Sequence, residues 1–451
     1  MTYPRTILSR HVRRSIMLLL ILAFAIIAPA IVFYTNGYRY DFDRKIITKT
    51  GVISIDVLPS DADVYVSGER INQSLPIRIP GKLPGVYPIV ISRPGYQSAH
   101  YTMEVKENQA TYLRGVTLIK ESTTEVLPTA QDARLMLAVP ASSGNFYILV
   151  HTATTTGFDV SLYDTTTQLR TIIDREQPKM PDILWSFQGD DVVIIYEEKT
   201  QHTLSVFSAK NPTVVSRHTF PTRPGEFPYP LLWQRVGSVN RLFGGFADMI
   251  FELQGQDPIP YSTVSSSAWF VSGSGDVWEA HPKQISLRNR THPAETIRSG
   301  TGIKRIIHIN DTRAIIEKDT GLVIIDRQGD WSRQINVRDG FETNYSPDRD
   351  EWFIILPSEM WIIDADGRTW PINRFGARVQ DVARMPEYSI VVYATRDTLG
   401  SFHEAYYISN NLYAGHDIDN IAINDALGAI YFTDLIEGTL QLLRRRLATK
   451  G

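Results

Sequence analysis

The sequence contains one uninterrupted apolar run, Ser15–Tyr34 (SIMLLLILAFAIIAPAIVFY), which carries no charged side chain. Twenty helical residues span about 30 Å, the thickness of the hydrocarbon core of a bilayer. Pro29 lies within the run and disfavours insertion, but each leucine, isoleucine, valine and phenylalanine favours insertion by roughly 0.3–0.6 kcal/mol and together they outweigh it. The run therefore predicts a transmembrane helix at residues 15–34, with a lipid bilayer as its partner.

Charge around this run predicts its orientation. Four arginines precede it, at positions 5, 10, 13 and 14, and four basic residues follow Tyr34 within fifteen residues, at positions 39, 44, 45 and 49. The count is balanced, but the segment Arg10–Arg14 forms a tight cluster against the helix with no acid nearby. Residues 1–14 are therefore expected to be a basic cytoplasmic tail. The chain is then a single-pass protein of the cell membrane, with its bulk extracytoplasmic.

A cleaved signal peptide is the alternative to a retained anchor. The segment Ala28-Pro29-Ala30 resembles a small-residue cleavage site behind a basic region. The apolar run continues through Ile31–Tyr34, which cleavage does not require, so a retained anchor is favoured. Residues 35–50 then form a juxtamembrane segment. The residues expected at the two membrane interfaces are Arg13, Arg14, Tyr34, Tyr38 and Arg39.

Composition narrows the class of protein further. The 451 residues exceed one ordinary domain. The formal net charge of −3 gives no basic footprint for nucleic acid, so no nucleic-acid partner is expected. The absence of cysteine excludes disulfides, thiolate metal sites and cysteine nucleophiles.

Residues 51–119 alternate between apolar and polar side chains. Ile53, Ile55 and Val57 alternate with serine and aspartate, and a second alternating run follows at residues 62–66. Further short runs, separated by turns rich in proline and glycine, continue to residue 119. A period of two is typical of half-buried strands. The segment predicts a small β-sandwich.

The order of landmarks in this sandwich resembles the PEGA domain. The landmarks are Gly51, Ile53, Ile55, Pro59, Ala62, Val64, Tyr65, Val66, Gly68, Leu75, Pro76, Leu83, Pro84, Gly85, Tyr87, Gly95 and Tyr96. The chain departs from the family at residues 70–74 (RINQS), where the family has a glycine-bearing approach to a Thr-Pro step. The resemblance implies a non-catalytic module of envelope and surface proteins that serves as a spacer or a binding module, often beside a membrane anchor.

Residues 120–130 are expected to be a linker, and residues 131–451 repeat short strands at roughly 36–50-residue spacing. Units of four strands begin near residues 134, 183, 231, 268, 304, 341, 379 and 421, although the last shows only three strands. Four strands per unit predicts a β-propeller. A strand at Thr123–Leu127 is available to complete the last unit and close the ring. Eight blades are favoured, and seven stay open because residues 266–300 are ragged.

One unit also resembles the TolB-like or WD40-like propeller repeat. It contains Tyr345-Ser346-Pro347-Asp348, followed by Trp352-Phe353-Ile354 and Trp361-Ile362-Ile363-Asp364. The predicted fold class is therefore an all-β ectodomain, a small β-sandwich plus a seven- or eight-bladed β-propeller, behind a single N-terminal transmembrane helix.

The propeller sequence contains none of the standard catalytic motifs. There is no G-x-S-x-G elbow and no H-E-x-x-H pair, and the ten histidines are scattered singly. His308, flanked by isoleucines, is expected to be a partly buried strand residue. No catalytic residue, cofactor or metal site is predicted.

All eight tryptophans lie in the propeller. Packing between blades is the favoured role for most of them, and glycan or peptide binding at an exposed rim is the alternative. The best candidate for an exposed binding loop is the segment 221–233 (PTRPGEFPYPLLW), with Phe227, Tyr229 and Trp233 as the candidate contacts.

Two functions follow from this organisation. The favoured one is a non-catalytic, membrane-anchored protein of the bacterial cell envelope, whose propeller binds a protein or a cell-wall polysaccharide. The alternative is an extracytoplasmic hydrolase or lyase with its site in the central funnel of the propeller. The alternative requires acidic, basic or histidine side chains with perturbed pKa values to converge at the funnel.

Overall fold

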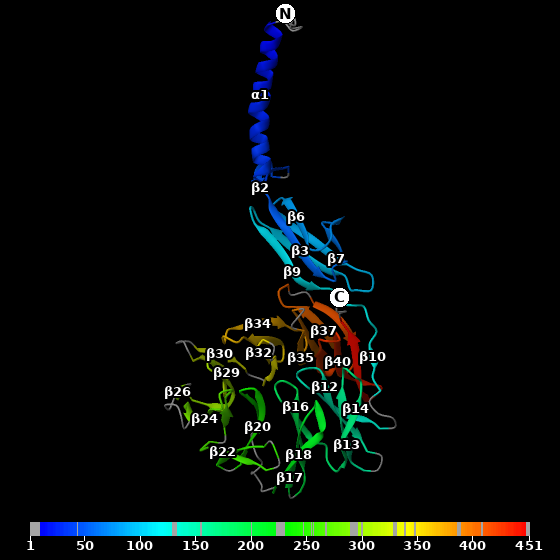
Figure 1. Cartoon of the computed structure of the whole chain (residues 1–451), viewed down its shortest axis with the longest axis vertical. Helices are drawn as coiled ribbons and strands as arrows, with labels where there is room; N and C mark the ends of the chain where they lie inside the picture. Colours follow the sequence, from blue (N-terminus) through cyan, green and yellow to red (C-terminus); the bar gives the residue numbers. More distant parts are fainter. Residues whose placement is uncertain are drawn as a thin grey trace, which may run out of the picture. The chain divides into compact units, whose positions relative to one another are not determined.

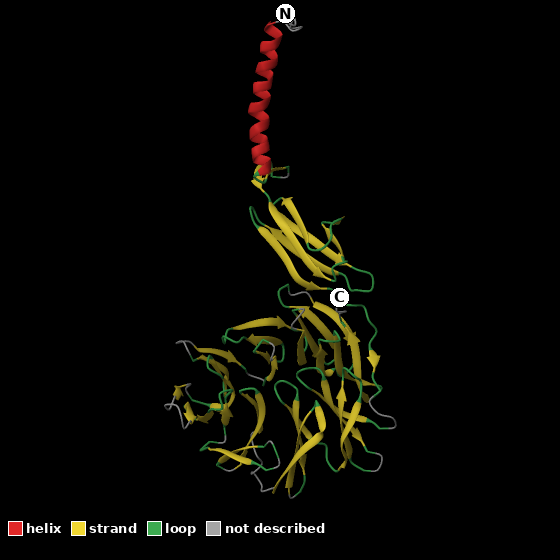
Figure 2. Cartoon of the chain, in the orientation of Figure 1, coloured by secondary structure: helices red, strands yellow, loops and turns green. Residues whose placement is uncertain are grey.

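A computed structural model of the chain describes residues 10–42, 44–128, 133–153, 156–199, 201–221, 231–246, 248–253, 255, 257–266, 268–288, 296–298, 301–327, 332–337, 340–346, 349–385, 389–406 and 409–447. One helix is followed by strands throughout this part of the chain (Figure 2). The chain divides into two compact units, residues 1–121 and residues 122–450.

The helix α1 (Arg10–Thr35) contains the predicted transmembrane segment. Its apolar window has a mean hydropathy of 3.1, and none of that window is buried within the protein. The helix ends where Gly37 adopts a left-handed φ of 82°, a conformation that commonly terminates helices. A short hairpin of β1 (Tyr38–Asp41) and β2 (Ile46–Lys49) follows directly.

The predicted small β-sandwich is present, built from two sheets. One sheet has the order β6-β3-β9 and the other the order β5-β4-β7-β8. The strands are β3 (Gly51–Leu58), β4 (Asp63–Val66), β5 (Glu69–Arg70), β6 (Ile77–Lys82), β7 (Gly85–Ser92), β8 (Ala99–Val105) and β9 (Ala110–Thr117). The alternating residues Ile53, Ile55 and Val57 are buried, and their polar neighbours face outward. The period of two in the sequence thus defines the inner face of the sandwich.

The second unit contains eight four-stranded sheets within its described residues, so the favoured blade number is confirmed. In Figure 1 the sheets follow one another around a ring in chain order, from cyan through green and yellow to red. The first four blades are β11 (Leu135–Pro140), β12 (Phe146–Thr152), β13 (Phe158–Asp164) and β14 (Arg170–Gln177); β15 (Asp182–Trp185), β16 (Asp191–Glu197), β17 (Gln201–Ser208) and β18 (Asn211–Pro221); β19 (Leu231–Val236), β20 (Val239–Phe246), β21 (Met249–Glu252) and β22 (Ile259–Thr263); and β23 (Trp269–Val271), β24 (Val277–His281), β25 (Gln284–Arg288) and β26 (Thr296–Arg298).

The other four blades complete the ring. They are β27 (Ile303–Ile309), β28 (Arg313–Lys318), β29 (Gly321–Asp326) and β30 (Ser332–Asn336); β31 (Glu342–Ser346), β32 (Glu351–Ile355), β33 (Glu359–Ile363) and β34 (Thr369–Arg374); β35 (Val379–Met385), β36 (Ile390–Thr395), β37 (Thr398–His403) and β38 (Ser409–Ala414); and β39 (Asp419–Asn424), β40 (Ala429–Ile436) and β41 (Thr439–Arg446) with β10 (Glu125–Val126). The ragged stretch at 266–300 forms blade 4.

The predicted closing strand completes blade 8. Strand β10 pairs antiparallel with β41, with Glu125 opposite Arg444 and Val126 opposite Leu443. The side chain of Arg444 donates a 2.5 Å hydrogen bond to the Glu125 carboxylate, which reinforces this pairing. The propeller therefore closes by joining the two ends of its own sequence, as the three-strand final unit predicted.

The core of the propeller lies between blades. Each cluster of buried side chains joins two neighbouring blades, and the cluster containing Tyr147 and Tyr431 joins blade 1 to blade 8. Middle strands such as β12 and β16 are apolar on both faces, because each sheet packs against a neighbour on either side. Full burial of a valine, leucine or isoleucine contributes roughly 1.5–3 kcal/mol. The ring is therefore held together by its blade interfaces.

Candidate functional site: the central channel

The first strands of all eight blades surround a central cavity of about 820 Å³. Residues from β11, β15, β19, β23, β27, β31, β35 and β39 line it, so the cavity occupies the channel of the propeller. A volume of this size accommodates a small ligand or the end of a chain.

Aromatic side chains meet across one end of the channel. Phe187, in the turn after β15, lies with its ring centroid 5.4 Å from that of Tyr345 and 6.0 Å from that of Trp352. Phe187 belongs to blade 2 and its partners to blade 6, which lie opposite each other in a ring of eight. The contact therefore crosses the channel and narrows it, at the end where the first strands finish.

His308 packs against the aromatic contact. Its ring lies 5.6 Å from Trp352 and 5.9 Å from Phe270, centroid to centroid. Burial, with the positive charge of Arg313, lowers the pKa of His308 to about 3. The imidazole is therefore neutral near pH 7, as a packed strand residue. This confirms the role expected from its isoleucine neighbours.

Asp381, on β35, is the acid that lines the channel. One carboxylate oxygen accepts a hydrogen bond from the Val382 amide and the other accepts one from the Ile421 amide of β39, both at 2.7 Å. Burial, with a smaller contribution from the Asp419 carboxylate, raises the pKa of Asp381 to about 7 although both amides oppose the shift. Asp381 forms no ion pair within the described part of the chain. Its pKa places it among the groups of the channel that titrate near neutral pH.

Three basic residues also line the channel, but each has an acidic neighbour. Arg384 forms ion pairs with Glu351 and Glu404. The Nε atom of Arg305 donates to Glu317 at 2.6 Å, and the Nζ atom of Lys304 lies 3.9 Å from Asp319. The channel wall therefore combines aromatic and aliphatic side chains with hydroxyl and amide groups and Asp381, and its basic charge is largely neutralised.

Most of the candidate binding loop, residues 221–233, lies outside the described residues. Phe227 and Tyr229 lie outside the described residues. Trp233 is 2% exposed and lies on β19, and its indole nitrogen donates to the Leu184 carbonyl of blade 2 at 3.0 Å. The expectation that Trp233 is an exposed ligand contact is wrong. Its side chain fills the interface between two blades, because an indole can bury its rings and still satisfy its N–H.

Other tryptophans join blades in the same way. The indole nitrogen of Trp185 donates to the Val139 carbonyl of blade 1 at 3.2 Å. Trp185, Trp269 and Trp352 also line the channel. Packing between blades is therefore a confirmed role for several tryptophans, and three of them additionally face the cavity.

The predicted interface residues lie at both ends of α1. Arg13 and Arg14 are exposed in its first turns, where no acid offsets their charge. Tyr34 is exposed at the other end. Arg39 places its guanidinium 3.5 Å from the Tyr34 ring centroid and donates to the Tyr34 carbonyl at 2.8 Å. The Lys49 ammonium lies over the Tyr38 ring. Arg39 therefore caps the helix, a role that its position alone did not indicate.

The sequence did not single out Asp381 or Phe187. The strand 379–385 (VQDVARM) also contains Gln380 and Arg384, so nothing local distinguished Asp381 from its polar neighbours. No local signal marked Phe187. Among the described residues, no group of three or more histidine, aspartate or glutamate side chains is arranged to hold a metal ion.

Comparisons with known proteins agree with the fold. Residues 50–122 match the PEGA domain family, which confirms the resemblance at residues 51–119. A search of curated proteins found no match to this chain.

Among solved structures, this chain is similar to an oligogalacturonate lyase in complex with manganese (11% identity, TM-score 0.44, covering 72% of this chain and 93% of that one). It is also similar to the WD40 domain of SCAP from fission yeast (10% identity, TM-score 0.44, covering 71% and 97%). A third similar structure is an uncharacterized protein from Listeria monocytogenes EGD-e (11% identity, TM-score 0.44, covering 64% and 97%).

Proposed function

We propose that this chain is a non-catalytic, membrane-anchored protein of the bacterial cell envelope, in which α1 is the anchor, the PEGA domain is a spacer and the propeller binds an extracytoplasmic partner. The length and hydropathy of α1 support the anchor, with residues 1–14 in the cytoplasm. The basic residues Arg13 and Arg14 lie at the helix N-terminus, where the helix dipole disfavours positive charge. Their presence is explained instead by the orientation of the helix in the membrane, because basic residues keep the adjacent helix end in the cytoplasm.

The observation that carries binding is the central channel. A cavity of about 820 Å³ lined by aromatic and aliphatic side chains, with several polar groups among them, is the usual form of a ligand site. Because Phe187 meets Tyr345 across the channel, this contact narrows one end, and a ligand is expected to enter from the other. The channel therefore suits the end of a polysaccharide, whose sugar rings stack on aromatic rings, or a terminal segment of a partner protein.

Channel tryptophans provide the test. Full-length protein in detergent micelles is titrated with solubilised cell-wall polysaccharide and, separately, with envelope protein fractions, while tryptophan fluorescence is followed. A saturable change is expected with one fraction, and Trp269→Phe is expected to weaken it. Trp370→Phe is the matched control, because Trp370 is 38% exposed and does not line the cavity. If none of the fractions produced a saturable change in tryptophan fluorescence, the proposal would be refuted.

The alternative of a channel hydrolase or lyase is favoured by the pKa of Asp381, which suits proton transfer near neutral pH. Against it, both oxygens of this carboxylate already accept hydrogen bonds from backbone amides, and the bond from Ile421 joins β35 to β39. We therefore favour binding. Product formation from the bound fraction that disappears in Asp381→Asn, with binding retained, would establish the enzyme instead.

A further inference from the structure

The hairpin β1–β2 that follows α1 has two different faces. Asp41 and Thr48 are buried on one face, and the Thr48 hydroxyl donates to the Glu107 carboxylate of the PEGA domain. The register places Tyr38 opposite Lys49 and Tyr40 opposite Ile47 on the other face. The polar face is therefore turned toward the protein.

The other face carries Tyr38, Tyr40, Phe42 and Ile47, here called the apolar hairpin face. Tyr40 is 47% exposed, Phe42 81% and Ile47 64%. The Tyr40 and Phe42 rings meet edge to face with centroids 5.1 Å apart. Large apolar side chains gathered at this exposure mark a surface that contacts another phase or molecule.

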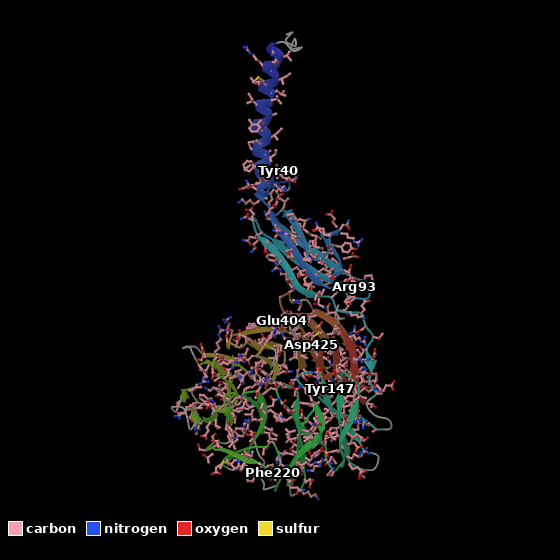
Figure 3. All side chains as sticks on the ribbon, viewed as in Figure 1. Tyr40, Arg93, Tyr147, Phe220, Glu404 and Asp425 are labelled. Atoms are coloured by element: carbon pink, nitrogen blue, oxygen red, sulfur yellow. The ribbon has the colours of Figure 1, made fainter. Side chains whose placement is uncertain are left out.

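This face is fixed to the end of α1. Phe33 of the helix and Tyr38 of the hairpin pack edge to face at 5.4 Å. The backbone amide and the hydroxyl of Thr50 both donate to the Gly37 carbonyl at 2.8 Å, which ties the far strand of the hairpin to the helix terminus. Figure 3 labels Tyr40 beside the end of the helix. The apolar hairpin face is thus continuous with the apolar surface of α1.

We propose that the apolar hairpin face inserts into the interfacial layer of the bilayer leaflet from which α1 emerges. The inference rests on the proposed anchor, since only a spanning α1 brings its C-terminal end to an interface. Tyrosine and phenylalanine rings are favoured at this depth, and basic side chains reach lipid phosphates beside them. Lys49, within 5.5 Å of the Tyr38 ring centroid, supplies such a charge. The hairpin is a second membrane contact besides the helix.

The chain contains no cysteine, so a single introduced cysteine carries a unique label. Three full-length variants, Ile47→Cys, Ala25→Cys and Val214→Cys, are labelled with an environment-sensitive fluorophore and reconstituted into vesicles of phosphatidylcholine and phosphatidylglycerol. Nitroxide lipids that quench near the headgroup or at mid-chain depth are then compared. Ala25 lies within α1. Val214 is 65% exposed on β18 of the propeller and is the matched control.

The shallow nitroxide is expected to quench the Ile47 label most, the deep one the Ala25 label most, and neither the Val214 label. A Phe42→Cys label should behave as Ile47 does, which guards against an effect of one substitution. Quenching at Ala25 without quenching at Ile47 or Phe42 would overturn the hairpin proposal and leave the anchor standing.

Two further outcomes of this experiment would also overturn the hairpin proposal. No quenching at Ala25 would overturn the anchor and the hairpin proposal with it. Unquenched, blue-shifted Ile47 fluorescence together with disulfide crosslinking between unlabelled Ile47→Cys chains would show that a second copy covers this face instead of lipid.

Discussion

The substitution Asp381→Asn is expected to destabilise the propeller at acidic pH and to stabilise it at alkaline pH. The ordinary pKa of an unfolded aspartate is 3.8, and burial raises that of Asp381 to about 7. Between these values the folded chain binds more protons at Asp381 than the unfolded chain does. The free energy of unfolding therefore falls as the pH rises through this window.

The size of the effect follows from the shift. At about 1.4 kcal/mol per pKa unit, ionising Asp381 lowers stability by at most about 4 kcal/mol between pH 4 and pH 8. Asparagine does not titrate. Its side chain has one acceptor oxygen, whereas the carboxylate uses two oxygens to accept hydrogen bonds from the two backbone amides. Losing one buried hydrogen bond costs about 1–3 kcal/mol. The variant should be less stable than the parent at pH 4.5 and more stable at pH 8.

Tryptophan fluorescence measures this effect in the propeller alone, because all eight tryptophans lie after residue 122. Guanidinium unfolding of parent and variant is compared at a series of pH values. Asp434→Asn is the matched control. The Asp434 carboxylate accepts bonds from the amides of residues 416, 417 and 435, and their donation lowers its pKa despite burial. Replacing Asp434 by asparagine should therefore destabilise the propeller most at neutral pH. A pH-independent difference for Asp381→Asn would refute the reasoning.

Three other substitutions, one of them with a control variant, test the ring. Trp233→Phe removes a hydrogen bond between blades and should cost about 1–2 kcal/mol in guanidinium unfolding; an unchanged midpoint would contradict the role of the indole. In Gly144→Ala, the new Cβ would lie 1.8 Å from a backbone oxygen of blade 8, so a loss of about 1–3 kcal/mol or more is expected. Gly237→Ala, with a similar φ but open space, separates this clash from backbone strain, and equal losses would rule the clash out. Phe187→Ala should widen the end of the channel that this ring narrows and increase acrylamide quenching of the channel tryptophans; unchanged quenching would argue against a role of Phe187 in restricting access.

Much of the fold was accessible from the sequence because its signals are local. The alternation at Ile53, Ile55 and Val57 specifies a half-buried strand wherever it occurs. Each four-strand unit consists of neighbouring hairpins, so its strands could be recognised one after another. The incomplete last unit even indicated the need for β10, since a three-stranded blade leaves an edge unpaired.

The candidate site was less predictable because it depends on ring closure. Phe187 meets Tyr345 only because blades 2 and 6 lie opposite each other, and no sequence spacing encodes that approach. Trp233 was taken for a loop residue because it follows a proline-rich segment, whereas its position on β19 buries it. The residues that flank Trp233 in the sequence do not show which groups the neighbouring blade places around its side chain.

The sequence by itself determined the long apolar helix, the strand-rich sandwich and the repeated four-strand units, because hydrophobic length and period are properties of consecutive residues. Only the tertiary structure decided that eight blades close into one ring, that aromatic side chains meet across the channel, and that Asp381 lies in a place where its charge is costly. Those features depend on groups brought together from distant strands, and burial and charge are set by all of these groups at once.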